Sequence, residues 1–244
     1  MAALFHTVIY QPIYNALALI VALVPGGDVG IGIIVLTIVV RFVLFPLSMS
    51  AIKSQIAMNR VGPALKALQD EHKDDKEALG KKTMELFREN KINPFSSFLL
   101  ILIQLPVIIG LYVVLRAEAK QISFDPSVLY PFVHAPVHVS LMFLGILNLT
   151  GKSFVLAAIV AVTQFFYARL LRPSKPPVPK PTGHKASFQE DMASNMQLQM
   201  QYVFPFLMAA VSYFATSAIA LYFIASNAFS ILQEIVVQKI HGKR

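Results

Sequence analysis

The chain has 244 residues, of which 56% are hydrophobic and 14% are charged, whereas soluble domains carry roughly 25% charged residues. This balance excludes a disordered chain, a coiled coil and almost every soluble enzyme, and it indicates an integral membrane protein. The formal charge of +8 predicts basic cytoplasmic loops before it predicts nucleic-acid binding. Because the chain has no cysteine, disulfides, thiolate metal sites and lipids attached through sulfur are excluded.

The N-terminal segment, residues 1–29, is apolar but interrupted. Its first 24 residues contain no Lys or Arg, so a cleavable signal peptide is not expected. The apolar stretch 16–24 is short for a membrane span and stops at a Pro-Gly-Gly turn. We predict an extracytoplasmic helix that lies in the membrane interface, with Tyr10 and Tyr14 at headgroup level. A frayed hydrophobic tail is the alternative.

Charge-poor stretches of about 20 residues predict an all-α integral membrane protein with five membrane-spanning helices. The predicted spans are residues 30–50, 95–115, 153–171, 198–214 and 217–237. The extracytoplasmic segment 116–152 contains a shorter apolar stretch, 137–149, for which we predict a half-helix at the interface.

A polar segment, residues 51–94, separates the first two predicted spans. It holds nine basic and seven acidic residues among strong helix formers, which predicts a cytoplasmic helical hairpin. Its apolar seam is narrow, so we expect a mobile hairpin that captures substrate. The seam residues are Leu65, Leu68, Leu79 and Phe87. Residues 172–197 predict a Pro-rich cytoplasmic loop, and residues 238–244 form a basic tail.

The distribution of Lys and Arg predicts the orientation. With five spans, the hairpin, residues 169–196 and the tail lie on one side and hold 17 basic residues, against 3 on the other side. Basic loops are retained in the cytoplasm. We therefore predict a C-terminus in the cytoplasm and an N-terminus outside.

Arg41 stands near the middle of the first predicted span. A charge at this depth costs at least ~2.5–3.5 kcal/mol on insertion scales. No Asp or Glu lies inside a predicted span except Glu234, at the cytoplasmic end of the last one. We therefore expect Arg41 to have no buried carboxylate partner and to face a water-filled cavity. Snorkelling or local thinning of the bilayer is the alternative.

Polar side chains recur at helical spacing on the predicted spans. Each of them has an ordinary structural explanation, because Ser and Thr bond their own helix and Gln bridges helices. Together with Arg41 they predict a shared hydrophilic groove. The candidate groove residues besides Arg41 are Thr37, Ser48, Ser97, Gln104, Thr163, Gln164, Tyr222 and Ser226.

Enzyme signatures are absent from the sequence. It contains no zinc-protease helix motif, no phosphate-binding loop and no nucleophile elbow. The pair His134 and His138 flanks a proline and is not expected to bind a metal. We therefore expect neither an enzyme nor a cofactor.

Several motifs occur in a characteristic order. They are TIVVRFVLFPL at 37–47, DDK at 74–76, INPF at 92–95, LLILIQLPVIIGLY at 99–112 and ALYFIASNAFSILQ at 220–233. In order and spacing they resemble the YidC family of membrane protein insertases, which includes the organellar oxidase-assembly and thylakoid insertases. The resemblance covers residues 11–238 and implies that Arg41, Thr37 and Gln104 are groove residues. The family's tyrosine pair is half matched, by Tyr222 followed by Phe223.

The resemblance implies an insertase that places small, mostly single- or double-spanning proteins in the cytoplasmic membrane without nucleotide hydrolysis. The implied partners are nascent membrane proteins and membrane lipids, with the ribosome, a targeting receptor and the general secretion channel as further candidates and no direct nucleic acid. Two alternatives remain: a small channel or anion carrier with Arg41 as its site, and an assembly chaperone that does not translocate.

Overall fold

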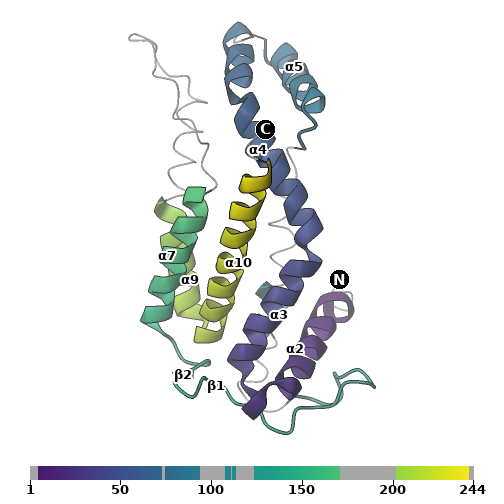
Figure 1. The fold of residues 1–244 in the computed structure, drawn as a ribbon, viewed down its shortest axis with the longest axis vertical. Coiled ribbons are helices and arrows are strands. Elements are labelled where there is room, and N and C mark those ends of the chain that lie inside the picture. The colour runs from purple at the N-terminus through teal and green to yellow at the C-terminus, as the bar shows by residue number, and fades with distance from the viewer. Residues whose placement is uncertain are drawn as a thin grey trace.

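The computed structural model describes residues 5–72, 75–93, 108–110, 112–113, 124–170 and 202–241. These residues are mostly helical (Figure 1). The elements are η1 (His6–Tyr10), α2 (Gln11–Leu23), η2 (Pro25–Gly27), α3 (Val29–Val43), α4 (Phe45–Glu71), α5 (Lys76–Glu89), β1 (Met142–Phe143), β2 (Leu147–Asn148), α7 (Phe154–Leu170), α9 (Phe204–Ala215) and α10 (Ser217–His241).

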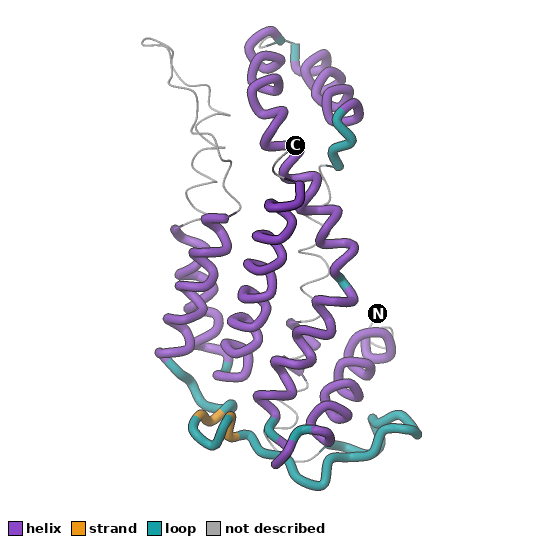
Figure 2. The backbone as a smooth tube through the Cα atoms, viewed as in Figure 1, coloured by secondary structure: helices purple, strands orange, loops and turns teal. Residues whose placement is uncertain are grey.

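The helices form an elongated bundle with α10 in the middle. Helix α10 packs against α3 and α4 on one side and against α7 and α9 on the other (Figure 1). The hairpin of α4 and α5 projects from one end of the bundle, and the loop with β1 and β2 crosses the opposite end (Figure 2). Helix α10 is therefore the element through which the two halves of the bundle meet.

Two of the described helical segments are long and apolar enough to cross a membrane. They are His6–Leu23 and Ser217–Ile240, and the bent pair Val29–Val43 with Phe45–Met58 makes a third candidate. Helices α7 and α9 are shorter apolar helices. The mostly helical fold is confirmed, whereas the count of five spans stays a prediction. The predicted second span lies outside the described residues except for 108–110 and 112–113, and the Pro-rich loop 172–197 lies wholly outside them.

The N-terminal helix lies within the predicted segment 1–29. Helical backbone continues from His6 to Leu23, which gives 18 residues. The apolar stretch 16–24 alone is short for a span, but the helix that contains it is long enough to cross a membrane. The interfacial position of this helix stays a prediction.

The chain bends sharply between α3 and α4. The two helices meet at Leu44 with an angle of 62° between Val29–Val43 and Phe45–Met58. Pro46 lies in the first turn of α4, where it lacks an N–H and its ring disfavours a continuous helix. Helix α4 then runs for 27 residues to Glu71. The break before the hairpin therefore lies at Leu44, not after residue 50 as predicted.

The segment between residues 137 and 149 is a small antiparallel hairpin (Figure 2). Met142 pairs with Asn148 and Phe143 with Leu147. Leu144 and Gly145 form the turn with φ of 52° and 72°, a left-handed conformation that an α-helix does not contain. The prediction of an interfacial half-helix is wrong, because this turn reverses the chain within the apolar stretch.

Two buried polar side chains fasten this loop region to the bundle. Asp28 caps α3 by accepting hydrogen bonds from the amides of Gly30 and Ile31, and its other oxygen accepts from Leu144 N at 2.7 Å. Asn15 on α2 donates to the carbonyl of Val128 and accepts from Tyr130 N at 2.6 Å. The loop therefore closes one end of the bundle through fully bonded polar groups.

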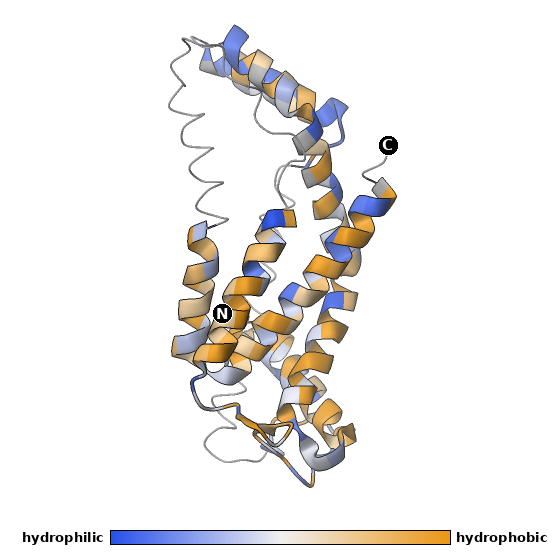
Figure 3. Ribbon diagram, turned by 60° about the vertical axis from the view of Figure 1, so that its left-hand side comes forward, coloured by the Kyte–Doolittle hydropathy of each residue, from blue (hydrophilic) through white to orange (hydrophobic). Residues whose placement is uncertain are grey.

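The hydrophobic core lies at this same end. Its most deeply buried side chains come from α2, α3, the loop, α7 and the first turns of α10. Burial of each large side chain contributes roughly 1.5–3 kcal/mol. The central members are Tyr14, Leu17, Ile33, Leu149, Val160 and Ile219. Figure 3 shows mostly hydrophobic residues along the bundle helices and frequent hydrophilic residues in the α4–α5 hairpin.

Candidate functional site

A row of polar side chains runs along the C-terminal two thirds of α10. We call it the polar line of α10, and it consists of Ser226, Asn227, Ser230, Gln233, Glu234 and Gln238. All but Gln238 are buried. The helical repeat divides the row into two faces, since residues seven positions apart lie on one side of a helix. One face contacts α3 and α4, and the other contacts α7.

Arg41 contacts the first face. Its Nη2 atom donates a hydrogen bond to the hydroxyl of Ser226, and the side chain is half-buried. In the part of the chain that the structure describes, no carboxylate lies within ion-pair distance of Arg41. Among the described residues, a neutral hydroxyl therefore holds the guanidinium, which has five N–H donors.

Ser48 extends this face beyond the Leu44 bend. Gln233 donates from Nε2 to the Ser48 hydroxyl at 2.6 Å, and Ser48 donates to the Phe45 carbonyl at 3.0 Å. Both side chains are buried. The pair joins α4 to α10 directly after the bend, and it fixes the position of Arg41 three residues before that bend.

Thr37 has a structural contact. It is buried, and its hydroxyl donates to the Ile33 carbonyl one turn earlier at 2.6 Å. Ser230 does the same on α10, donating to the Ser226 carbonyl at 3.0 Å. In the described structure these two hydroxyls therefore bond their own helices, as Ser and Thr commonly do in apolar surroundings.

The second face of α10 contacts α7. Asn227 donates from Nδ2 to the Thr163 hydroxyl at 3.2 Å. Gln238 donates to the Leu170 carbonyl at 3.0 Å and to Glu234 Oε1 at 2.8 Å. Glu234 is 3% exposed, and its Oε2 atom is buried without a hydrogen-bond partner among the described residues.

The remaining predicted groove residues lie in different surroundings. Tyr222 is buried on α10, with its ring centroid 5.6 Å from that of Phe223. Gln164 is half-buried on α7. Ser97 and Gln104 lie outside the described residues. The structure therefore places Arg41, Ser48 and Thr163 in contact with polar residues of α10, among them the predicted groove residue Ser226. It says nothing of Ser97 and Gln104.

Asn227 and Gln238 were not singled out from the sequence, and Glu234 was considered only as a carboxylate at a span end. A signal for them exists. Positions 227, 234 and 238 repeat at intervals of seven and four, which marks a second helix face beside the first. A search for two polar faces on the last span would have found these three residues.

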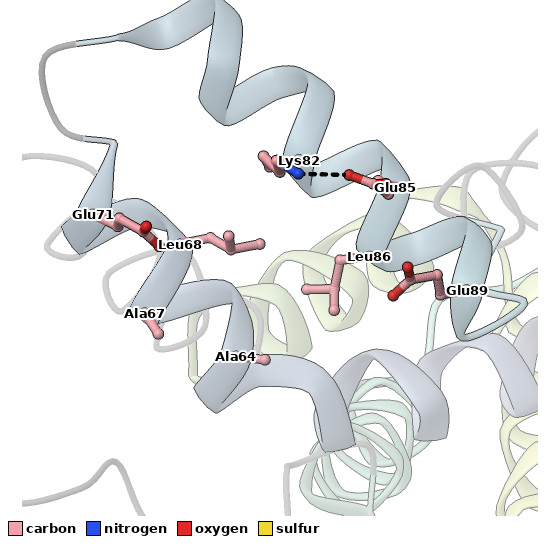
Figure 4. A pocket seen from close by; sticks show the side chains of 8 residues that line it. All are labelled: Ala64, Ala67, Leu68, Glu71, Lys82, Glu85, Leu86 and Glu89. Atoms are coloured by element: carbon pink, nitrogen blue, oxygen red, sulfur yellow. Dashed lines mark hydrogen bonds and ion pairs between the residues drawn. The ribbon is translucent and has the colours of Figure 1, made fainter.

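The hairpin encloses a cleft between α4 and α5 (Figure 4). Its volume is about 430 Å³, and Leu68 and Leu86 point into it from the two helices. Its other lining residues are Ala64, Ala67, Glu71, Lys82, Glu85 and Glu89. Of the predicted seam, Leu68 lines this cleft, and Leu65, Leu79 and Phe87 are half-buried.

Apolar helices of spanning length around a buried polar row define an integral membrane protein with a polar site inside its helical bundle. The family described as 60Kd inner membrane protein matches residues 20–244, so the chain belongs to that family. The resemblance to YidC insertases is thereby confirmed.

Relatives named membrane protein insertase YidC match most of the chain. The protein of Fusobacterium nucleatum is 30% identical over 214 residues, which cover 87% of each chain. Those of Francisella philomiragia and Francisella tularensis subsp. novicida are 29% and 30% identical over 213 residues. These matches cover 87% of this chain and 33% of the longer Francisella proteins.

Proposed function

We propose that this chain inserts small, mostly single- or double-spanning proteins into the cytoplasmic membrane and helps them fold. The route is a hydrophilic groove, open to lipid, along the polar line of α10, and no nucleotide is hydrolysed. One observation carries the proposal: the guanidinium of Arg41 meets an uncharged hydroxyl, Ser226, inside a bundle of the insertase family.

The task of such a protein is to move a hydrophilic tail across ~30 Å of hydrocarbon. Polar side chains on α3, α4, α7 and α10 offer the tail hydrogen-bond partners that lipid lacks. An acidic residue in the tail gains more, because its carboxylate carries the opposite charge and accepts two parallel N–H···O bonds from the Arg41 guanidinium. Arg41 exchanges the Ser226 hydroxyl for that carboxylate, and the two return to contact when the tail has passed.

The apolar segment of the client leaves the protein sideways into lipid. Large apolar side chains are exposed on α3 and α9, among them Phe42, Val43, Phe206 and Phe214. Such a surface suits contact with acyl chains and with an apolar client helix. Partitioning of that helix into lipid contributes ~0.8 kcal/mol per buried CH₂ group, which supplies a driving force without nucleotide.

The proposal includes the predicted orientation, with the N-terminus outside and the α4–α5 hairpin in the cytoplasm. The hairpin then meets the client, or a partner that delivers it, before the client reaches the bundle. Its cleft is lined by the apolar side chains of Leu68 and Leu86 and by acidic side chains. The acidic residues are Glu71, Glu85 and Glu89. The ribosome, a targeting receptor and the secretion channel are the candidate partners at this surface.

The test is insertion into liposomes that contain only the purified chain. Two single-span clients differ in the translocated tail, which is acidic in one and neutral in the other. Arg41→Lys keeps the charge and should retain much of the insertion activity. Arg41→Ala should reduce insertion of the acidic client about tenfold and of the neutral client less.

Lys152→Ala is the matched control, since it removes one positive charge at the loop end, where Lys152 lies over the rings of Tyr213 and Phe214. It should leave both clients unaffected. Equal loss for both clients with Arg41→Ala contradicts attraction of the tail by charge. Failure of the wild-type chain to insert either client contradicts the proposed function and favours an assembly chaperone, or a channel if ions cross.

A further inference from the structure

Of the two carboxylate oxygens of Glu234, only one has a hydrogen-bond partner among the described residues. Its Oε1 atom accepts from Gln238 at 2.8 Å, whereas Oε2 is buried without a partner among the described residues. A buried polar atom without a hydrogen bond is rare in folded proteins and expensive. Packing alone does not account for a carboxylate here, because a glutamine would fill the same space and accept the same bond.

The surroundings hold this carboxylate in a fixed place. Gln238 anchors it from the next turn while bonding the Leu170 carbonyl on α7, and Gln233 beside it is bonded to Ser48 on α4. The phenol of Tyr167 lies within electrostatic range of both Glu234 and Arg41. Glu234 therefore lies on the α7 face of the polar line of α10, and Arg41 contacts the other face of the same line.

We propose that Glu234 binds a cation of the client: the lysine ammonium or arginine guanidinium that flanks the client's apolar segment on its cytoplasmic side. This inference rests on the proposed function and extends its site. Lysine and arginine bring only donors, so either group supplies what Oε2 lacks. Basic residues flank most membrane spans on that side, so nearly every client carries the ligand.

The position of Glu234 along α10 agrees with this role. It follows Ser226, the contact of Arg41, by eight residues, which is about 12 Å along a helix. In the proposed orientation it lies nearer the cytoplasm than Arg41 does. Arg41 then binds the client's translocated tail, and Glu234 binds its cytoplasmic flank. The two groups follow one another along the site in the same order as the tail and the flank along the client.

The experiment compares two neutral-tailed clients in liposomes without a membrane potential. Their cytoplasmic flanks carry two lysines or two glutamines. The wild-type chain should insert the lysine client about fivefold faster. Glu234→Gln, which keeps the shape and the acceptor for Gln238, should abolish the preference. Glu234→Lys should reverse it towards a client whose flank carries two glutamates, an outcome that loss of packing does not produce.

Asp125→Asn is the matched control at the loop end, where it removes an exposed carboxylate charge, keeps an acceptor for the Ser127 amide and leaves Glu234 in place. It should keep the fivefold preference. The melting temperature of each variant in detergent checks its fold, and Glu234→Gln should melt no lower than wild type. If the wild-type chain inserts both clients equally fast, the proposal is overturned while the proposed function stands.

Contact is measured separately, because the chain has no cysteine of its own. Ile231→Cys, one turn before Glu234, should form a disulfide with a cysteine beside the client's lysines in the solubilised chain. The yield should fall about fivefold when Glu234→Gln is added. This readout does not need insertion, so a chain that inserts neither client still decides whether Glu234 binds the flank. An unchanged yield rejects the cation site.

Discussion

Buried polar groups at the loop end of the bundle are hydrogen-bonded more completely than those along the polar line of α10. At the loop end, Asp28 accepts three backbone hydrogen bonds and Asn15 accepts one while donating to carbonyls on two segments. Along the polar line of α10, among the described residues, Arg41 bonds the Ser226 hydroxyl and Oε2 of Glu234 has no hydrogen-bond partner. Polar groups whose hydrogen bonds are all made within the protein stabilise the fold. Polar groups with unused hydrogen-bonding atoms can bind a ligand. The following substitutions separate the two cases by their effect on stability.

The largest loss of stability is expected for Gly27→Ala. Gly27 has φ of +65°, and an added Cβ would lie 1.9 Å from the carbonyl oxygen of His138. Strain and the displaced loop should cost about 3 kcal/mol. Gly26→Ala is the control, because Gly26 has φ of +74° and open space around it. Its cost should be about 1 kcal/mol, as thermal unfolding in detergent would measure. Equal melting temperatures would mean that the loop does not dock at Gly27.

Asp28→Ala should come next, with a loss of about 2 kcal/mol. It removes the cap of α3 and the bond to the Leu144 amide together. Asp75 caps α5 in the same way, through the amides of Glu77 and Ala78, but it is exposed and holds no second segment. Asp75→Ala should cost under ~1 kcal/mol of local helix stability. Hydrogen exchange at the first amides of each helix measures both effects, and a larger effect at Asp75 would refute the assigned roles.

Arg41→Ala and Ser226→Ala should change stability by less than ~1 kcal/mol each, since a hydrogen bond between membrane helices contributes ~0.6 kcal/mol on average. Removing Arg41 also removes the cost of holding a charge at that depth. Thermal unfolding in detergent measures the difference. A loss as large as that for Asp28→Ala would place Arg41 among the structural groups of the loop end.

The smallest effect is expected in the hairpin. Lys81 lies 2.7 Å from Glu77, and Lys82 lies 3.1 Å from Glu85, both pairs at the surface of α5. Exposed pairs one turn apart contribute about 0.3–0.5 kcal/mol. Glu77→Gln should therefore change amide exchange in α5 less than twofold, and added salt should reduce even that difference. Exchange slowed throughout residues 60–88 to the level of α10 would contradict a mobile hairpin.

The sequence predicts the residues around the polar line of α10 better than the contacts of the loop end, for a physical reason. A charge in an apolar segment, such as Arg41, is conspicuous because its cost is large whatever the fold. Ser226 and Ser48 follow from helical spacing alone. The bonds of Asp28 and Asn15 join segments more than 100 residues apart, and no local pattern predicts which carbonyl or amide such a side chain meets.

The β-hairpin escaped prediction for a similar reason. The stretch 137–149 is mostly apolar, and a short apolar run is compatible with either a helix or a strand. The choice is made by the turn at Leu144 and Gly145 and by bonds to distant residues, such as that between the Val29 amide and the Ser140 carbonyl. The bend at Leu44 was readable, since Pro46 stands in the sequence, but the apolar residues around it favoured one continuous span.

That bend has a mechanical consequence. Helix α4 has 27 residues, with Pro63 in its interior, and is about 40 Å long. It starts at the Leu44 bend, three residues beyond Arg41. Tilting the helix by about 5° moves its far end by about 3.5 Å at this length. Conversely, a force applied at the tip of the hairpin produces at the bend a torque equal to that force multiplied by the length of the helix. A load on the hairpin, some 40 Å away, therefore reaches the bond between Ser48 and Gln233 first, and through it the hydrogen bond between Arg41 and Ser226.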